Sequence, residues 1–149
     1  MNGAQVHHDD ERHLRRAIAL AAAAREAGNP PFGSLLAGPD GTVIAEEQNT
    51  TITDNDITAH PELKLARWAA ANLAPDVAAA TTMYTSCQPC GMCTGALERS
   101  GLGRVVFALA TAQLDSLKSA SFTAGPRPVP QDGPALFDEA RKPLEGYYR

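Results

Sequence analysis

The sequence contains no apolar run that approaches the roughly 20 residues needed to cross a bilayer, so we expect no membrane-spanning segment. It also has no excess of positive charge, because 13 lysines and arginines stand against 17 aspartates and glutamates and give a formal net charge of −4. Proteins that bind polynucleotides generally carry a basic face, since neutralising phosphates supplies much of their affinity. The acidic balance therefore disfavours a nucleic-acid partner.

Cysteine is scarce, and its placement excludes a disulfide scaffold. Cys87, Cys90 and Cys93 lie close together, whereas a disulfide framework has an even number of cysteines spread along the chain. Such a cluster is typical of a metal site in a reducing compartment, and we expect a cytoplasmic location. Residues 12–24 are basic and then weakly apolar, like a short signal peptide. Acidic residues on both sides and helical apolar spacing favour an amphipathic core helix instead.

The chain of 149 residues fits one ordinary domain, and its apolar fraction of 44% is close to the average for globular proteins. Apolar periodicity and turn residues predict helices over 10–27, 61–73, 90 to 101 or 103, 111–120 and 135–142, and strands over 32–37, 42–46, 81–86 and 104–109. Asp9 or Asp10 can cap the first helix and Gly28 can end it, and Pro61 suits the first position of the second helix. This order predicts a central sheet covered by helices on both faces, a three-layer α/β/α sandwich. We interpret residues 1–149 as a single domain with a proline-rich tail from about residue 125 that wraps the surface or a partner subunit.

Two short motifs carry the chemistry. The first is His60-Pro61-Glu62, and the second, 27 residues further on, is Pro89-Cys90-Gly91-Met92-Cys93. Each motif alone is weak evidence, because a lone C-x-x-C can also be a redox pair or half of a structural zinc site. Together and in this order they match the signature H-x-E…P-C-x-x-C of zinc deaminases.

The predicted helices bring three zinc ligands together. Cys90 and Cys93 fall at positions i and i+3 in the first turn of one helix, so both sulfurs face the same way. A helix N-terminus also favours thiolate over thiol. His60 directly precedes another helix, so two helix N-termini can present three ligands at one point. Three protein ligands leave the fourth tetrahedral position of zinc open, which is typical of a catalytic site.

Glu62 is the predicted catalytic residue. It precedes Leu65 and Ala66 by three and four residues, so it points to the same buried side of its helix. A carboxylate without a partner is costly in that position. Beside water activated by a metal it can act as general acid and base.

The residues resemble the cytidine deaminase-like superfamily. The resemblance rests on residues 49–62 (NTTITDNDITAHPE), 83–96 (MYTSCQPCGMCTGA) and 29–33 (NPPFG), and it covers roughly residues 10–110. Within the superfamily it favours the branch of bacterial guanine deaminases, fungal-type cytosine deaminases and tRNA adenosine deaminases. It implies a mixed sheet of about five strands, a homodimer, and a pocket above the zinc that binds a small-molecule base and releases its amino group as ammonia.

The resemblance also implies roles for individual residues. His60, Cys90 and Cys93 would hold Zn²⁺, Glu62 would move protons, and Cys87 would stay outside the metal. The implied substrate contacts are the Asn49 side chain, backbone groups at Ala59 and near Ser86, stacking on Phe32, and Tyr148 of the C-terminal tail.

The substrate is left open by a departure from the guanine deaminases. These enzymes carry an acidic pair before a phenylalanine after the last core strand, where this chain has Lys118-Ser119-Ala120-Ser121-Phe122. Cytosine or an amino-triazine therefore competes with guanine as the substrate. The alternative functions are a tRNA-editing adenosine deaminase, a nucleoside deaminase, and a structural zinc module that uses Cys87 as a fourth ligand.

Overall fold

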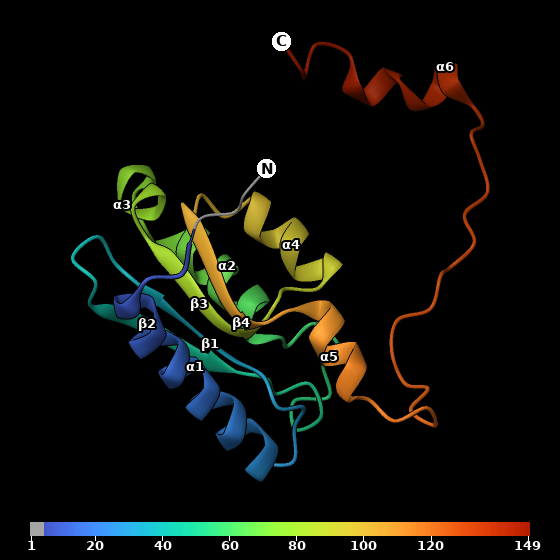
Figure 1. Ribbon diagram of the computed structural model, residues 1–149. Helices are drawn as coiled ribbons and strands as arrows, with labels where there is room; N and C mark the ends of the chain where they lie inside the picture. Colours follow the sequence, from blue (N-terminus) through green and yellow to red (C-terminus); the bar gives the residue numbers. More distant parts are fainter. Residues whose placement is uncertain (1–4) are drawn as a thin grey trace. The chain divides into compact units, whose positions relative to one another are not determined.

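The computed structural model describes residues 5–149 (Figure 1). The chain divides into two compact units, one extending to Lys118 and the other comprising Ser119–Arg149. The first unit contains α1 (His8–Glu26), β1 (Gly33–Ala37), β2 (Val43–Gln48), α2 (Pro61–Asn72), α3 (Pro75–Ala79), β3 (Thr82–Cys87), α4 (Gly91–Glu98), β4 (Arg104–Leu109) and α5 (Thr111–Leu117). The second unit contains α6 (Phe137–Ala140) and the short 3₁₀ helix η1 (Lys142–Leu144).

The strands form one mixed sheet in the order β2-β1-β3-β4. β1 pairs antiparallel with both β2 and β3, whereas β3 and β4 are parallel. The predicted α/β class is confirmed, but the expected count of about five strands is wrong, because residues 5–149 form four. The segment after α5 contains Pro126, Pro128 and Pro130, which have no backbone N–H to donate to a strand ladder.

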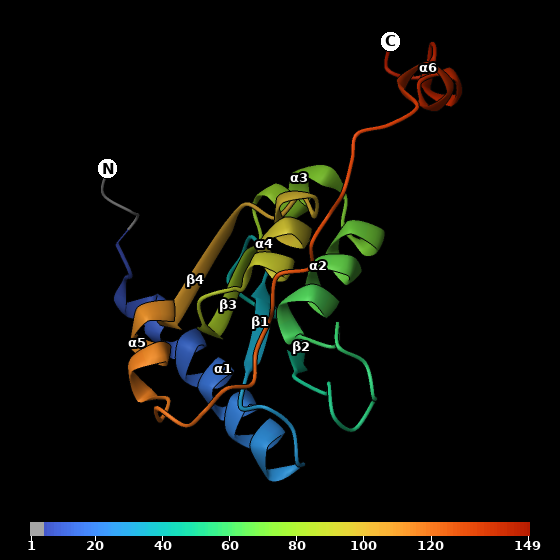
Figure 2. The same cartoon turned by 90° about the vertical axis from the view of Figure 1, so that its right-hand side faces the viewer.

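Helices cover both faces of the sheet, as the sequence predicts. α1 packs on one face against β1 and β3, and α2 packs on the other face beside α4 (Figures 1 and 2). Neighbouring residues of each central strand point to opposite faces, as pleating requires. One buried cluster comprises Leu14, Leu35, Ala37, Tyr84 and Val106, and the other comprises Leu36, Leu65, Ala69 and Met83.

A glycine at the start of β1 lets α1 lie close to the sheet. A Cβ atom on Gly33 would lie 2.5 Å from the Leu20 Cβ and 2.6 Å from the Ala17 carbonyl oxygen, which no side chain tolerates. The Gly33 N–H donates to the Ser86 hydroxyl of β3 at 3.1 Å. These contacts fix the end of β1 from which Phe32 and the loop to α1 extend.

The helix boundaries follow the predicted start and stop residues only in part. α4 ends at Glu98, short of the predicted 101 or 103, and α5 ends at Leu117, short of the predicted 120. Gly28 has φ +92° directly after α1, and Pro61 occupies the first turn of α2, as predicted. Neither Asp9 nor Asp10 is the N-cap of α1, however, because that position is His7, whose backbone N–H donates to the Asp10 carboxylate at 2.8 Å. α3 was not predicted. Among residues 5–149, no helix combines the length and apolarity required to span a bilayer.

Candidate active site

The two motifs lie at the N-termini of two helices that pack together. His60 is the N-cap residue of α2, and Cys90 is the N-cap residue of α4. Cys93 follows in the first turn of α4 and is fully buried. Because α2 and α4 contact each other on the same face of the sheet, both motifs reach one point.

His60, Cys90 and Cys93 form a group that fits a tetrahedral metal. Their ligand atoms all lie within 4.8 Å of one another. The His60 Nδ1 lies 3.7 Å from the Cys90 Sγ and 3.5 Å from the Cys93 Sγ. Zinc bonds of roughly 2.05 Å to nitrogen and 2.3 Å to sulfur at a tetrahedral angle place these atoms about 3.6 Å apart. Spacing and donor types therefore both suit Zn²⁺.

Burial opposes charge on two of these donors. It lowers the pKa of His60 and raises the pKa of the Cys93 thiol, to which the nearby Glu62 carboxylate also contributes. Metal binding needs a neutral imidazole and a thiolate. The histidine is already suited to a metal, whereas the thiol loses its proton when a cation supplies the compensating charge.

Glu62 is buried next to these donors, with 6% of its surface exposed. Burial raises its pKa to about 7, and its own backbone N–H opposes the rise only in part. No side chain among residues 5–149 forms an ion pair with it. A carboxyl group with a pKa near 7 can both accept and donate a proton at neutral pH.

A small pocket opens onto the carboxylate and onto two of the three metal donors. It has a volume of about 90 Å³ and is lined by Phe32, Asn49, His60, Pro61, Glu62, Cys87, Gln88, Cys90 and Leu114. Pockets for drug-sized ligands are roughly 300–1,000 Å³. The lining combines apolar walls with a few polar groups, which suits a small planar ring.

Asn49 presents hydrogen-bond donors to this pocket. Its side-chain Oδ1 accepts from both the backbone N–H and the hydroxyl of Thr51, each at 2.9 Å. These two donors fix the orientation of the amide, since a backbone N–H requires an oxygen acceptor. The Asn49 Nδ2 has no acceptor among the described residues 5–149. The side chain is therefore suited to a ring acceptor such as a carbonyl oxygen.

The structure brings together most, but not all, of the predicted site residues. Ala59 and Ser86 are buried neighbours of lining residues but are not among the lining residues. The Ala59 carbonyl accepts from the Thr50 N–H at 3.1 Å. Tyr148 lies in the second unit, with its ring in edge contact with Tyr147. The substrate contacts expected of Ala59, Ser86 and Tyr148 stay predictions.

Gln88 and Leu114 are among the lining residues that carried no predicted substrate role. The Gln88 Oε1 accepts from the Thr111 backbone N–H at 3.0 Å, which ties the first turn of α5 to the loop before Cys90. This contact places Leu114 of α5 in the pocket wall. Gln88 stands beside the cysteine motif, so its position was a signal. Nothing local marked Leu114, because its place depends on how α5 packs.

Fold and site together define a class of protein, a metal-dependent hydrolase with three protein donors and one buried acid. Comparison with known families agrees with this class. Residues 7–109 match the family described as "Cytidine and deoxycytidylate deaminase zinc-binding region". The chain belongs to this family of zinc-dependent deaminases, which confirms the predicted resemblance and the predicted cofactor.

Individual relatives within the family have different substrates. The chain is 30% identical to a probable cytosine deaminase of Schizosaccharomyces pombe, over 99% of this chain and 98% of that protein. It is 35% identical to a tRNA-specific adenosine deaminase of Haemophilus influenzae, over 72% of this chain but only 62% of that protein. The crystal structure of guanine deaminase from Bacillus subtilis superposes with a TM-score of 0.74 at 31% identity, covering 96% of this chain and 94% of that chain.

Proposed function

We propose that this protein hydrolyses an exocyclic amino group of a nucleobase-type ring and releases it as ammonia. One observation carries the proposal: the buried carboxyl group of Glu62, which has no ion-pair partner among residues 5–149, shares a small pocket with His60 and Cys90, two of the three donors arranged for zinc. An unpartnered carboxylate destabilises the fold. Its position is explained if it transfers protons in the reaction.

The reaction needs two proton transfers, and Glu62 is placed to make both. A bound zinc ion supplies a water molecule of lowered pKa. Glu62 would accept a proton from the attacking water and donate it to a ring nitrogen as the water oxygen bonds to the ring carbon. It would then accept the remaining proton, from the hydroxyl group on that carbon, and donate it to the amino group. The carbon–nitrogen bond breaks, ammonia leaves, and a carbonyl group remains on the ring. His60, Cys90 and Cys93 hold the metal, and Phe32 contacts the face of the ring.

The pocket supports a ring that bears an acceptor opposite Asn49, such as the carbonyl oxygen of cytosine or guanine or a ring nitrogen of an amino-triazine. Glu62 is the sole carboxylate among the lining residues. The wall that α5 contributes is the apolar Leu114, close to the point where the sequence lacks the acidic pair. This arrangement favours cytosine or an amino-triazine over guanine, whose donor edge would face no second carboxylate.

Ammonia release from a defined panel tests the proposal. Zinc-loaded protein is incubated with cytosine, guanine, melamine, cytidine, adenosine and a tRNA anticodon stem-loop, with Glu62→Gln as the inactive control. Release from one of the free rings, absent in the control while zinc remains bound, is expected. Activity on the stem-loop alone would replace the proposal with RNA editing, and activity on a nucleoside alone with nucleoside deamination.

Substitution of Cys87 distinguishes an enzyme from a structural zinc module. Its thiol lies outside the metal group formed by His60, Cys90 and Cys93, although it is buried and lines the pocket. We expect Cys87→Ala to keep one zinc per chain, measured by metal analysis after dialysis, and Cys93→Ala to lose it. Loss of zinc from Cys87→Ala, with no ammonia released by the wild type, would support the structural module.

We also propose a homodimer that forms through the outer edge of β4. A groove of about 390 Å³ between α4 and β4 has apolar walls that include Leu97, Leu102, Val105 and Phe107. The other edge of β4 has no strand partner among residues 5–149. Light scattering should give twice the chain mass for the wild type and the single mass for Phe107→Glu. We further propose that the tail from about residue 125 wraps the surface or the partner subunit. We also propose that the protein is cytoplasmic, a location that suits its three free cysteines.

A further inference from the structure

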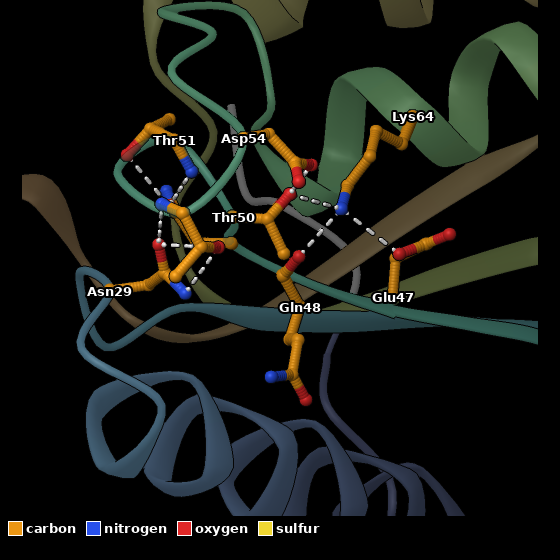
Figure 3. Close-up of polar contacts among 9 residues, drawn as sticks. Asn29, Glu47, Gln48, Thr50, Thr51, Asp54 and Lys64 are labelled. Atoms are coloured by element: carbon orange, nitrogen blue, oxygen red, sulfur yellow. Dashed lines mark hydrogen bonds and ion pairs between the residues drawn. The ribbon is translucent and has the colours of Figure 1, made fainter.

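Lys64 lies on α2, two residues after Glu62, and its ammonium group reaches the strand end beside the pocket. The Lys64 Nζ donates to the Gln48 backbone carbonyl at 2.8 Å and to the Thr50 hydroxyl at 3.0 Å. It also lies 3.0 Å from the Glu47 carboxylate, and 22% of its side chain is exposed (Figure 3). All three donors of the ammonium group therefore have a partner.

Two of these partners flank Asn49 in the sequence. The Gln48 carbonyl directly precedes Asn49, and the Thr50 hydroxyl directly follows it. The Thr50 hydroxyl in turn donates to the Asp54 carboxylate at 2.6 Å, which extends the contact into the next turn of the loop. Lys64 thus holds the backbone on both sides of Asn49, while the Asn49 side chain points toward the pocket.

The rest of the loop needs such support because no strand or helix orders it. From Asn49 to His60 the backbone forms turns, and residues 52–57 are exposed. Asn29 holds the part of the loop that follows Thr51. Its side-chain oxygen accepts from the N–H groups of Ile52 and Thr53 at 3.1 Å each (Figure 3). Asn29 fixes the loop to the segment after α1, whereas Lys64 fixes it to the helix that carries Glu62.

The ion pair with Glu47 does not by itself account for a lysine at this position. The Glu47 side chain is 41% exposed, and exposed ion pairs contribute little to stability. The carbonyl and hydroxyl contacts are different, since they need a long side chain with several donors at its end. The arrangement therefore points to positioning of the backbone around Asn49.

We propose that Lys64 is a positioning residue, which holds Asn49 at the distance from Glu62 that ring binding requires. The inference rests on the proposed function, because it assigns Asn49 to the ring. A misplacement of about 1 Å at a substrate contact can lower the rate by as much as 10²-fold. Because α2 carries both Lys64 and Glu62, one helix sets the spacing between the group that binds the ring and the group that moves its protons.

A double-mutant cycle tests the proposal. We measure kcat and KM for ammonia release from cytosine and guanine in wild type, Lys64→Met, Asn49→Ala and the double variant. If Lys64 acts through Asn49, Lys64→Met lowers kcat/KM about tenfold in the wild type and has no further effect in Asn49→Ala. If Lys64 has only a structural role, the same loss occurs in both backgrounds and the proposal is wrong. No loss in the wild type would overturn it as well.

Arg16 of α1 provides a matched control. It donates two hydrogen bonds, 2.7 and 2.9 Å long, to Glu46 of β2, the strand that also carries the Lys64 partners Glu47 and Gln48. Arg16→Met removes a comparable cation that pairs with β2, and it leaves the contacts of the two residues that flank Asn49 unchanged. It should leave kcat and KM unchanged. A loss equal to that of Lys64→Met would mean that any weakening of β2 suffices, and would contradict the specific role of Lys64.

Hydrogen exchange separates failure of this inference from failure of the proposed function. If the wild type releases no ammonia from either base with zinc bound, the proposed function fails. Exchange at the Thr50, Thr51 and Ile52 amides of the substrate-free protein then decides the positioning role. Lys64→Met should speed it about tenfold, the rate change that corresponds to roughly 1.4 kcal/mol, whereas Arg16→Met should not. Unchanged exchange in Lys64→Met would overturn the role.

Discussion

Two buried carboxyl groups in the first unit of this protein have pKa values that are shifted in opposite directions. Glu62 is 6% exposed and Asp10 is 4% exposed, so removal from water penalises the charged form of both. Burial raises the pKa of Glu62 to about 7. Hydrogen bonds from Arg104, and then from Tyr84, hold the pKa of Asp10 well below its usual range. The hydrogen bonds to Asp10 outweigh the penalty of its burial, whereas Glu62 has only its own backbone N–H to oppose that penalty.

The partners also indicate what each carboxyl group is for. Asp10 accepts from both terminal nitrogens of Arg104 at 3.0 Å and from the Tyr84 hydroxyl at 2.6 Å, and so joins α1 to β3 and β4. Among residues 5–149 no arginine or tyrosine donates to Glu62, which lines a pocket together with two of the three metal donors, His60 and Cys90. A satisfied carboxylate stabilises the fold, whereas an unsatisfied one in a pocket is a candidate for proton transfer.

The largest expected effect comes from Glu62→Gln. The amide keeps the size of the side chain but cannot carry the proton, so we expect kcat for ammonia release to fall by about 10³-fold. The melting temperature should not fall, because the change removes a buried ionisable group that has no ion-pair partner among residues 5–149. Kinetics, zinc content and a thermal melt on the same sample check both statements. Wild-type turnover in this variant, with zinc bound, would remove Glu62 from the reaction.

Asp10→Asn should show the opposite pattern. The substitution leaves the Arg104 guanidinium with a neutral acceptor. Because Arg104 is 33% exposed, we expect a loss of about 2 kcal/mol of unfolding free energy, less than for a fully buried pair. The folded variant should keep its kcat, because Asp10 lines no part of the site pocket. Urea titration and steady-state kinetics measure the two quantities. A loss of kcat with full stability would mean that Asp10 communicates with the site.

The two groups should also give the pH dependence of stability opposite slopes in zinc-free protein. Above its unfolded pKa of about 4, ionised Asp10 stabilises the fold, and this contribution is lost as the pH falls. Glu62 is protonated in the folded state up to pH about 7 but ionised in the unfolded chain above about 4.3. The unfolded chain then binds fewer protons, so stability decreases as the pH rises through this window.

Urea midpoints between pH 3 and 8 measure these slopes. We expect the decrease in stability caused by Glu62 to amount to about 4 kcal/mol, at 1.4 kcal/mol for each unit of pKa difference. Glu62→Gln should flatten the decrease from about pH 4.3 to 7, and Asp10→Asn should flatten the decrease on the acid side. If the decrease in stability between about pH 4.3 and 7 were unchanged in Glu62→Gln, another group would be its cause.

The two carboxyl groups differ in how far the sequence revealed them. Glu62 was predicted as buried and catalytic because its helix periodicity and the short motif around His60 are local features. Asp10 was considered only as a helix cap. Its partners lie 74 and 94 residues away, so only the packing of α1 on β3 and β4 brings them together. Local patterns reveal a site built on helix N-termini, whereas long-range pairing remains hidden.

The same distinction explains other outcomes. The order of elements and the three layers follow from apolar periodicity, and the structure confirms them. The short helix α3 was missed because its five residues are too few to show a period. Leu114 was missed because its position depends on α5, and the Lys64 contacts were missed because a lysine on a helix usually faces solvent. The three candidate metal donors were predicted from two local motifs, without knowledge of how the elements pack.

The smallest effect is expected from a third carboxyl group, Glu46, which has an arginine partner but little burial. Arg16 binds it with two hydrogen bonds and lowers its pKa, a geometry much like that of the pair between Arg104 and Asp10. Arg16 is 52% exposed, however, so water screens the pair. Arg16→Met should therefore leave the urea midpoint unchanged within error. A loss as large as that of Asp10→Asn would mean that the bidentate geometry alone, without burial, stabilises the fold.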